Sequence, residues 1–561
     1  MNRQLLLATL APALALGPLR AADIQSNYWY QSTITTDANG PLDLLAELNY
    51  DDAQANAPIA VVMHGYSPAT GNLSGLRPNA QRLRDNGFFV ISVAMRGRDG
   101  SDGVRDSGGL EIHDIYDAVE AVKAGPQFAG LIDPGNIHIT GYSGGGGNTM
   151  SALTKFPDYF RVGAAFFGMS DYGYDPANCW YNNGADSSHQ SIMNNDVGNP
   201  NTGGNRVLDK YLARASNLAS KNNPYSEIHL FVNSSETTCP PVNDTSYRDH
   251  AVAAESFAGE FDNITVHIGG TGAYEDFNGN SVNDANELQS WPHMFPTVNH
   301  QDAGELWYRD RLLAGTIPQP VLNDSDELQV AGFVKTAKFD CWLGDGQNAA
   351  GTLSYSLSDT LMSFSLALLT SDLRVTGDLS IDTARMAGRE VRVELNDEPV
   401  STFSGGGTFE FSGLGHNDTL ELIDTGGENT FSNWIAGFDV GGLDGLDEDP
   451  DGDGIQNGVE NVFGTLPDTF SQGLVAGAVT GNTFTFTHPL NATPAGDLTA
   501  TYRWSTDLQA FHDDGDSNGG GTTTVTFSEP TTAGEVVSVT ATITGSVIPD
   551  KLFVVVEVTQ N

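Results

Sequence analysis

Short apolar, β-rich runs alternate with amphipathic stretches of helical period from about Tyr28 to Gly315. This alternation constrains the fold most, because parallel strands need a crossover connection and a helix is the usual one. The expected strands begin at Ile59, Phe88, Ile137, Val162, Glu227 and Ile264, and the expected helices at Leu110, Gly145, Val207 and Asp302. We therefore expect an α/β domain over residues 23–318, with a mostly parallel sheet covered by helices on both faces.

The pattern changes after residue 318. Between 319 and 428 the helical period fades, and runs such as GTLSYSLS and REVRVELN alternate apolar and polar residues between turn residues. A second alternating block covers 471–561, and an acidic, Gly-rich connector, 429–470, lies between the two. Such alternation is typical of antiparallel sandwiches, so we expect two β-sandwich-like domains.

The first 22 residues have the pattern of a secretory signal peptide. One basic residue precedes the apolar run LLLATLAPALALG, which is too short to span a bilayer and is followed by small residues. No later stretch reaches about 18 uninterrupted apolar residues. The expected mature protein is soluble, without a membrane span, and secreted or periplasmic.

Charge limits the partners of this chain. It has 26 Lys and Arg against 71 Asp and Glu, a formal net charge of −45. Nucleic-acid binding requires clustered cations to neutralise phosphates, so an acidic surface argues against a nucleic-acid partner.

The strongest chemical motif is Gly-x-Ser-x-Gly in ITGYSGGGGNTM, with the serine at Ser143. An apolar run enters the motif and a helix-like stretch leaves it, which is the context of a nucleophile elbow. On such a turn the serine is exposed, and Gly141 and Gly145 lack side chains so that strand and helix can approach. Ser143 is therefore the predicted nucleophile; the alternative is an ordinary turn serine.

A serine hydroxyl is a weak nucleophile at neutral pH, so Ser143 needs a base and an orienting acid. Glu236 follows the strand EIHLFVN at the carboxyl end of the sheet and is the expected acid. The base is expected at His293, after the last strand. The alternatives left open are Asp244 or Asp249 for the acid and His300 for the base.

An oxyanion hole is expected where the first predicted strand ends. Strand IAVVM runs into His64, Gly65 and Tyr66. The backbone N–H of Tyr66 is placed to join that of Gly144, the residue after the predicted nucleophile. His64 itself is expected to order the loop.

Several segments resemble the prolyl-oligopeptidase and dienelactone-hydrolase-like branch of the α/β hydrolases. Besides GYSGGG, MRGRDGSDG is similar to the Arg-Gly segment after the fourth strand of that branch, and FVNSSETTCPPV to its acid loop. The likeness covers about Ala57 to Gly315. It implies an α/β-hydrolase fold with Ser143 as nucleophile, Glu236 as acid, His293 as base, and Tyr66 and Gly144 as oxyanion donors. Glu236 stands where the branch usually has Asp, and HGY replaces a commoner HGG.

Calcium is the second chemical theme. DPDGDGIQNGVE places carboxylates and an amide at positions 1, 3, 5, 9 and 12 of a twelve-residue loop: Asp449, Asp451, Asp453, Asn457 and Glu460. Gly454 occupies position 6, where such loops turn sharply. The segment resembles thrombospondin-type and dockerin-like calcium repeats, so a structural Ca²⁺ is expected; the alternative is an acidic flexible linker.

A weaker calcium pattern precedes the predicted base. The expected ligands, at positions 1, 3, 5, 9 and 12, are Asp276, Asn278, Asn280, Asp284 and Glu287. Ser281 stands where such a loop requires Gly, so weaker affinity is expected, and a solvated Asn-rich insertion is an equal alternative.

Three cysteines are too few for a disulfide scaffold, but Cys179 and Cys239 are a possible pair that would hold the segment after the strand VGAAFFGM. Aromatic residues of that segment suit an aryl, sugar or polymer ester, or else belong to the core: Tyr172, Tyr174, Trp180 and Tyr181.

Together these features predict a secreted serine hydrolase that cleaves carboxylic esters without a catalytic cofactor. The substrate is expected to be a small-molecule or polymer-linked ester, and the C-terminal β domains are expected to contact a surface or polysaccharide. A serine peptidase of prolyl-oligopeptidase type is the alternative. A non-catalytic adhesin is a third reading, which an intact Ser, Glu and His set disfavours.

Overall fold

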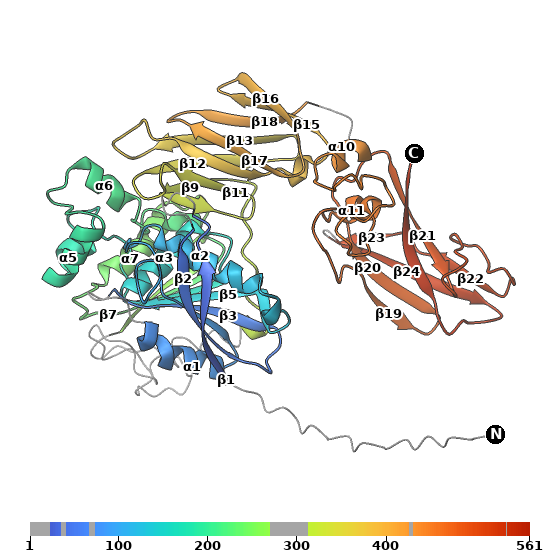
Figure 1. The fold of residues 1–561 in the computed structure, drawn as a ribbon, viewed down its shortest axis with the longest axis horizontal. Helices are drawn as coiled ribbons and strands as arrows, with labels where there is room; N and C mark the ends of the chain where they lie inside the picture. Colours follow the sequence, from blue (N-terminus) through green and yellow to red (C-terminus); the bar gives the residue numbers. More distant parts are fainter. Residues whose placement is uncertain (1–22, 35–40, 67–72, 270–311, 426–429, 534–535) are drawn as a thin grey trace, which may run out of the picture. The chain divides into compact units, whose positions relative to one another are not determined.

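The computed structural model describes residues 23–34, 41–66, 73–269, 312–425, 430–533 and 536–561 (Figure 1). The chain divides into two compact units. The first comprises residues up to Val321 together with Asp345–Ala349, and the second comprises Leu322–Gly344 and Ala350–Asn561. The signal-peptide pattern, His293, His300 and the Asp276–Glu287 loop lie outside the described residues.

The first unit is built on an eight-stranded sheet with the order β1-β2-β4-β3-β5-β6-β7-β8 (Figure 1). Strands β3 to β8 are mutually parallel, whereas β2 pairs antiparallel with both β1 and β4. The strands are β1 (Asp23–Gln31), β2 (Asp43–Asp51), β3 (Ala57–Met63), β4 (Phe89–Val93), β5 (Ile132–Tyr142), β6 (Val162–Phe166), β7 (Glu227–Asn233) and β8 (Ile264–Gly269). The expected α/β-hydrolase fold is confirmed.

Helices cover both faces of this sheet. In Figure 1, α1 lies below the sheet, and α2 and α3 lie above it. Because both faces are covered, every residue of β3, β4 and β6 is buried, which explains their continuous apolar sequences. The helices are α1 (Arg77–Asp85), α2 (Glu111–Lys123), α3 (Gly144–Lys155), α4 (Trp180–Asn183), α5 (Ser187–Asp196), α6 (Asn205–Leu212) and α7 (Val242–Ala253).

The helix expected from Val207 to Lys221 is much shorter in the structure. Helix α6 ends at Leu212, and a 3₁₀ turn follows only at Ser220–Asn222. Beyond α6 the Arg214 side chain is almost fully buried and pairs with Asp106. Tertiary pairing of this arginine therefore overrides the apolar period that suggested one continuous helix.

The second unit begins with an antiparallel sheet of the order β16-β15-β18-β13-β12-β9-β10-β11-β14-β17. Its two ends meet, because the rings of Phe403 on β16 and Phe409 on β17 stack at 4.4 Å. The sheet thus folds back on itself around an apolar core, as in a sandwich. Its strands are β9 (Ser325–Ala331), β10 (Phe333–Lys335), β11 (Phe339–Leu343), β12 (Ala350–Leu357), β13 (Leu361–Leu368), β14 (Gly377–Asp382), β15 (Glu390–Leu395), β16 (Glu398–Ser404), β17 (Thr408–Leu414) and β18 (Thr419–Asp424).

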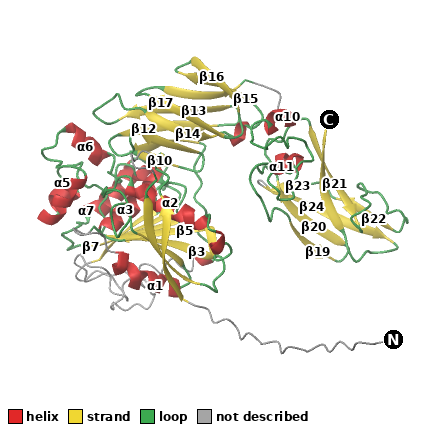
Figure 2. Cartoon of the chain, in the orientation of Figure 1, coloured by secondary structure: helices red, strands yellow, loops and turns green. Residues whose placement is uncertain are grey.

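The rest of the second unit combines two short helices with two antiparallel sheets (Figure 2). One sheet contains β19, β20, β24, β22 and β23, and the other pairs β21 with β25. Trp504, Val525 and Ala541 form one buried cluster of this module, which is β-rich as expected. The elements are α10 (Phe431–Ile435), α11 (Asn457–Phe463), β19 (Ala476–Thr480), β20 (Thr483–Pro489), β21 (Leu498–Ser505), β22 (Thr523–Phe527), β23 (Thr531–Ala533), β24 (Val536–Gly545) and β25 (Phe553–Gln560).

No helix in the described part of the chain combines the length and the apolar character needed to cross a membrane.

Candidate active site

Ser143 occupies the sharp turn between β5 and α3. Its backbone has φ 56° and ψ −120°, a conformation that costs a non-glycine residue energy and that is a mark of functional turns. The turn is held on both sides, because the Ser143 N–H donates to the Phe166 carbonyl and the Ser143 carbonyl accepts from the Gly147 N–H, both at 3.0 Å. The side chain is partly exposed, unlike its neighbours on α3.

The glycines on either side of Ser143 allow the close approach that the motif predicts. A Cβ on Gly141 would lie 2.2 Å from the Gly145 carbonyl oxygen. A Cβ on Gly145 would lie 2.3 Å from the Met63 carbonyl oxygen at the end of β3. Strand β5, helix α3 and strand β3 therefore meet at a distance that only glycine permits.

Tyr66 and Gly144 lie side by side next to Ser143. A Cβ on Gly144 would be 2.6 Å from the Tyr66 backbone nitrogen, and a Cβ on Gly65 would be 3.7 Å from Ser143 Oγ. Within the described part of the chain, neither the Tyr66 nor the Gly144 N–H has a hydrogen-bond acceptor. Two free backbone donors beside a nucleophile are the elements of an oxyanion hole.

The Tyr66 side chain ends in a buried polar network. Its hydroxyl lies 2.7 Å from Asn148 Oδ1, 2.9 Å from Glu111 Oε1 and 3.0 Å from the Tyr172 hydroxyl. Burial, and next the charge of Glu111, raises the pKa of Tyr66 well above its usual range. The hydroxyl is therefore a neutral, fully engaged group, and the backbone N–H is the donor that this residue offers to the site.

Arg98 completes this network on the other side of the tyrosine ring. Its guanidinium lies 5.0 Å from the centre of the Tyr66 ring and 3.7 Å from Glu111 Oε2, and both charged side chains are fully buried. The network was not foreseen from the sequence. The signal for Glu111 was an acidic residue next to the apolar stripe of α2. The signal for Asn148 was an amide one turn beyond the serine motif. Neither signal reveals the partner of its residue.

Glu236 lies in the turn after β7 and is 5 % exposed. Its Oε1 accepts the backbone N–H groups of Thr238 at 2.6 Å and Cys239 at 3.1 Å. These donors fix the carboxylate at the carboxyl end of the sheet, the side on which β5 runs into Ser143. It keeps its role as the predicted acid.

The two alternative acids differ in their environment. Asp249 is exposed and pairs with its neighbour Arg248 at 2.6 Å. Asp244 is fully buried, and neither of its carboxylate oxygens has a hydrogen-bond partner among the residues that the structure describes. Burial, with the charge of Glu236 in addition, raises the pKa of Asp244 well above its usual range.

The possible disulfide between Cys179 and Cys239 is not formed, since both cysteines are buried free thiols. The Cys239 side chain instead lies within hydrogen-bonding reach of Ser143, and its sulfur is 3.8 Å from Met169 Sδ. Burial, and then the charges of Glu236 and Asp244, raises the pKa of this thiol well above its usual range. A neutral thiol therefore borders the predicted nucleophile, a contact that sequence spacing did not indicate.

The attachment expected from that disulfide is supplied by a tryptophan. The Trp180 indole N–H donates to the Thr238 carbonyl at 2.7 Å and so ties the segment after β6 to the acid loop. Of the aromatic residues considered for substrate contact, Tyr172, Trp180 and Tyr181 are buried, whereas Tyr174 is partly exposed. The first three are core residues.

His64 orders the loop before Tyr66, as expected. Its two ring nitrogens lie 2.8 Å from the Gly65 carbonyl and 3.1 Å from the Ala94 carbonyl, and the ring is fully buried.

A family model described as the prolyl oligopeptidase family matches residues 74–198, a segment that contains Ser143 but not Glu236. Among solved structures, an acylaminoacyl peptidase of Pyrococcus horikoshii is 17 % identical with a TM-score of 0.37, over 54 % of this chain and 43 % of that one. An esterase of Pyrococcus furiosus is 12 % identical with a TM-score of 0.33, over 52 % of this chain and 90 % of that one. A puromycin hydrolase is 14 % identical with a TM-score of 0.38, over 56 % of this chain and 40 % of that one.

The chain thus covers less than half of the peptidase and of the puromycin hydrolase. No curated protein matches the chain. The family model and the geometry around Ser143 together support a serine hydrolase.

Proposed function

We propose that this chain is a secreted serine hydrolase that cleaves carboxylic esters through an acyl-enzyme on Ser143. The observation that carries the proposal is the strained turn of Ser143 beside the N–H groups of Tyr66 and Gly144, which have no acceptor within the described ranges. Strain at a non-glycine residue persists only where the surrounding structure enforces it, and here it places one hydroxyl beside two backbone donors.

The proposed reaction uses each group in a defined step. Ser143 Oγ attacks the ester carbonyl while His293 takes the hydroxyl proton, and Glu236 orients the imidazole. The Tyr66 and Gly144 N–H groups stabilise the oxyanion, which collapses as the leaving alkoxide takes the proton from His293. Water then attacks the acyl-enzyme, gives its proton to His293 and releases the acid, so Ser143 regains its hydrogen and no cofactor is consumed.

A serine peptidase is the second candidate, and the match of residues 74–198 to the prolyl oligopeptidase family favours it. The two activities share the nucleophile and oxyanion hole and differ in the leaving group. An amine must be protonated before it leaves, whereas an ester alkoxide leaves more readily. Secretion is proposed from the first 22 residues, and surface attachment from the β-rich second unit.

The test combines active-site labelling with a substrate panel. A fluorophosphonate should label wild-type protein at Ser143, and Ser143→Ala should lose both labelling and hydrolysis of short-acyl nitrophenyl esters while its melting curve is kept. Ser151→Ala is the matched control, because Ser151 lies on the same helix α3 and its buried hydroxyl has no hydrogen-bond partner in the described part of the chain.

Two results would change the conclusion. Full activity in Ser143→Ala would exclude this site as the catalytic centre. Faster cleavage of aminoacyl or prolyl amides than of esters, with labelling at Ser143 retained, would keep the nucleophile and replace the esterase by the peptidase.

A further inference from the structure

The acidic connector before α11 gathers three carboxylates in one place. One oxygen each of Asp449, Asp451 and Asp453 lies within 4.8 Å of the others. Among the described residues, no Lys or Arg side chain forms an ion pair with any of them. Like charges held at this separation repel, so the cluster is unfavourable unless a cation neutralises it.

An independent observation comes from α11. Glu460 on this helix is fully buried, and among the described residues its Oε2 has no hydrogen-bond partner, while Oε1 is 3.2 Å from Thr465 Oγ1. Asp451, Asp453 and Asp449 each lie close enough to the Glu460 carboxyl to interact with it electrostatically. The Glu460 carboxyl therefore faces the aspartate cluster, and burying it there without a counter-charge is costly.

Further oxygen atoms around the cluster also lack donors. Asp451 Oδ2 and Asn457 Oδ1 are buried, and neither has a hydrogen-bond partner in the part of the chain that the structure describes. The Asn457 amide is held in place, because its Nδ2 donates to the carbonyls of Leu443 at 2.9 Å and Gly445 at 2.8 Å. In the described part of the chain, no N–H donates to the Ile455 carbonyl either.

The backbone of the loop is already bent for this arrangement. Gly454 has φ 91°, a conformation that disfavours any side chain, and its N–H donates to Asp449 Oδ2 at 2.8 Å. A twelve-residue calcium loop requires a glycine at this sixth position for its sharp turn.

We propose that Asp449, Asp451, Asp453 and Glu460 bind one Ca²⁺, with the Ile455 carbonyl as a fifth ligand. Asn457 Oδ1, at the ninth position, is a ligand through a bridging water. The site contains only oxygen donors and neither His nor Cys, so it suits a hard cation rather than zinc or copper. Four carboxylates and a carbonyl exceed what Mg²⁺ accepts from protein, because Mg²⁺ keeps several of its waters.

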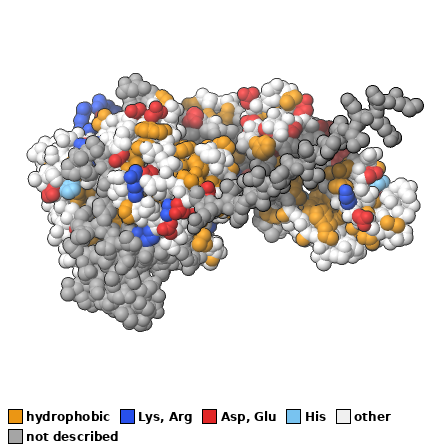
Figure 3. All heavy atoms as spheres, turned by 60° about the horizontal axis from the view of Figure 1, so that its bottom comes forward, with side chains coloured by type: hydrophobic (Ala, Val, Ile, Leu, Met, Phe, Trp, Pro, Cys, Tyr) orange, Lys and Arg blue, Asp and Glu red, His pale blue; other side chains and the backbone are white. Residues whose placement is uncertain are grey.

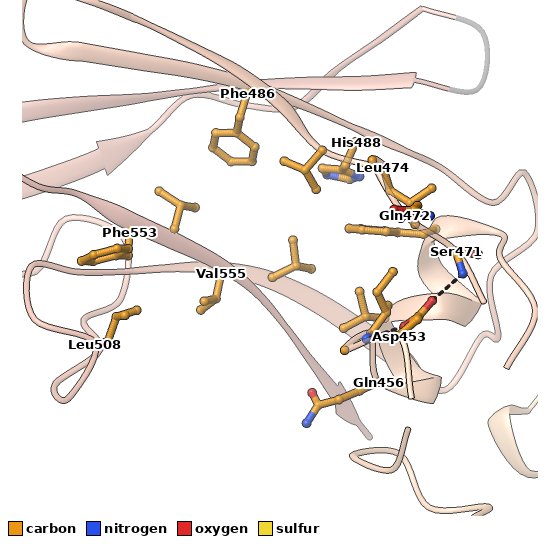
Figure 4. Close-up of a pocket in the computed structure, with 18 of the residues that line it drawn as sticks. Asp453, Gln456, Ser471, Gln472, Leu474, Phe486, His488, Leu508, Phe553 and Val555 are labelled. Carbon is orange, nitrogen blue, oxygen red and sulfur yellow. Dashed lines mark hydrogen bonds between the residues drawn. The ribbon is translucent and has the colours of Figure 1, made fainter. Parts of the chain in front are cut away.

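The bound ion would also stabilise the C-terminal module. Asp453 Oδ2 accepts the Ser471 N–H at 2.7 Å, and the two residues border an apolar pocket (Figure 4). On other sides this pocket is lined by Phe486 on β20 and Val555 on β25. Exposed apolar side chains, such as those of Val475 and Leu508, occur on the same module, where Figure 3 shows hydrophobic side chains gathered. Metal binding would hold Asp453 in place, and with it Ser471 in the segment that joins α11 to β19.

The test is a calcium titration of the full chain by calorimetry, in physiological salt with millimolar magnesium to suppress weak binding to the acidic surface. Asp451→Asn keeps the side-chain shape and removes a ligand charge, and Glu460→Gln does the same at the buried carboxyl. Asp468→Asn is the matched control, because it removes one exposed carboxylate of the same connector outside the cluster.

Wild type and Asp468→Asn should bind the same number of calcium ions. Asp451→Asn and Glu460→Gln should each lose one equivalent, or bind it about 100-fold more weakly. At calcium near 100 times Kd, the melting temperature of the second unit should rise by roughly 5–10 °C in wild type and not in these two variants. The proposal would be overturned if wild type and both folded variants bound calcium with equal stoichiometry and affinity. It would also be overturned if Asp468→Asn lost a calcium ion in the presence of magnesium. If either variant melts without calcium at the temperature of calcium-free wild type, misfolding does not explain its loss.

Discussion

Replacing Gly144 by Ala tests the proposed oxyanion hole, because the added methyl group has no room. Its position would be 2.5 Å from Tyr66 Cγ and 2.6 Å from the Tyr66 backbone nitrogen, whereas ordinary contacts begin near 3.4 Å. Gly144 and Tyr66 must therefore separate by about 0.8 Å, which is comparable to the ~1 Å misplacement that can cost about 100-fold in rate.

The expected effect falls on kcat rather than on KM. Both N–H donors shift relative to Ser143 Oγ, and the loss of one oxyanion donor costs about 10²–10³ in kcat, or roughly 3–4 kcal/mol of transition-state stabilisation. The helix itself should tolerate the change, since Ala favours a helix over Gly by about 1 kcal/mol. Initial-rate kinetics on a short-acyl nitrophenyl ester measure kcat and KM. Thermal melting of the same samples measures stability.

Gly135→Ala provides the matched control. Gly135 lies in the same strand β5, and its added methyl group would meet its nearest neighbour, Gln319 Oε1, at an ordinary 3.5 Å. This variant should keep wild-type kcat. A folded Gly144→Ala protein with kcat within about threefold of wild type would refute the placement of the oxyanion hole at Tyr66 and Gly144.

Two further predictions concern buried polar groups. Tyr66→Phe leaves Glu111 and Asn148 without the hydroxyl, so chemical denaturation should show a loss of about 1–3 kcal/mol while kcat changes only a few fold; unchanged stability would show that the network is satisfied without it. Burial lowers the pKa of Lys155 to about 7. Between about pH 7 and 10.5 the unfolded chain therefore binds a proton that the folded chain lacks. The free energy of unfolding should rise with pH over this range by up to roughly 5 kcal/mol. Lys155→Met should flatten that rise relative to wild type, and an identical pH dependence of unfolding in both proteins would contradict the shift.

Local sequence determined the catalytic turn and the parallel strands. The expected strands at Glu227 and Ile264 match β7 and β8 at both ends, because each is a short β-rich run bounded by turn residues. Ser143 was recognisable for a related reason. A strained turn between a strand and a helix requires glycines on both sides, and all the residues that define it lie within five consecutive positions.

Long-range contacts could not be read in this way. Strands β1 and β2 were not foreseen. Strand β1 is largely exposed and shows no strict alternation. The Tyr66 hydroxyl meets Glu111 from 45 residues away and Asn148 from 82 residues away. The spacing of these residues along the chain does not predict their contact. The contact follows only from the packing of α2 and α3 on one face of the sheet.

The cysteines show the same division. Composition and spacing allowed a Cys179–Cys239 bond, since both residues flank segments that meet near the acid loop. The folded chain holds them as free thiols and places Cys239 against Ser143, while the indole of Trp180 makes the attachment. What the sequence by itself determined are features encoded within a few neighbouring residues: the elbow at Ser143, the strand pattern and the twelve-residue acidic loop. Which buried side chains meet was decided only by the tertiary structure, because burial selects contacts by shape and hydrogen-bond partners rather than by separation along the chain.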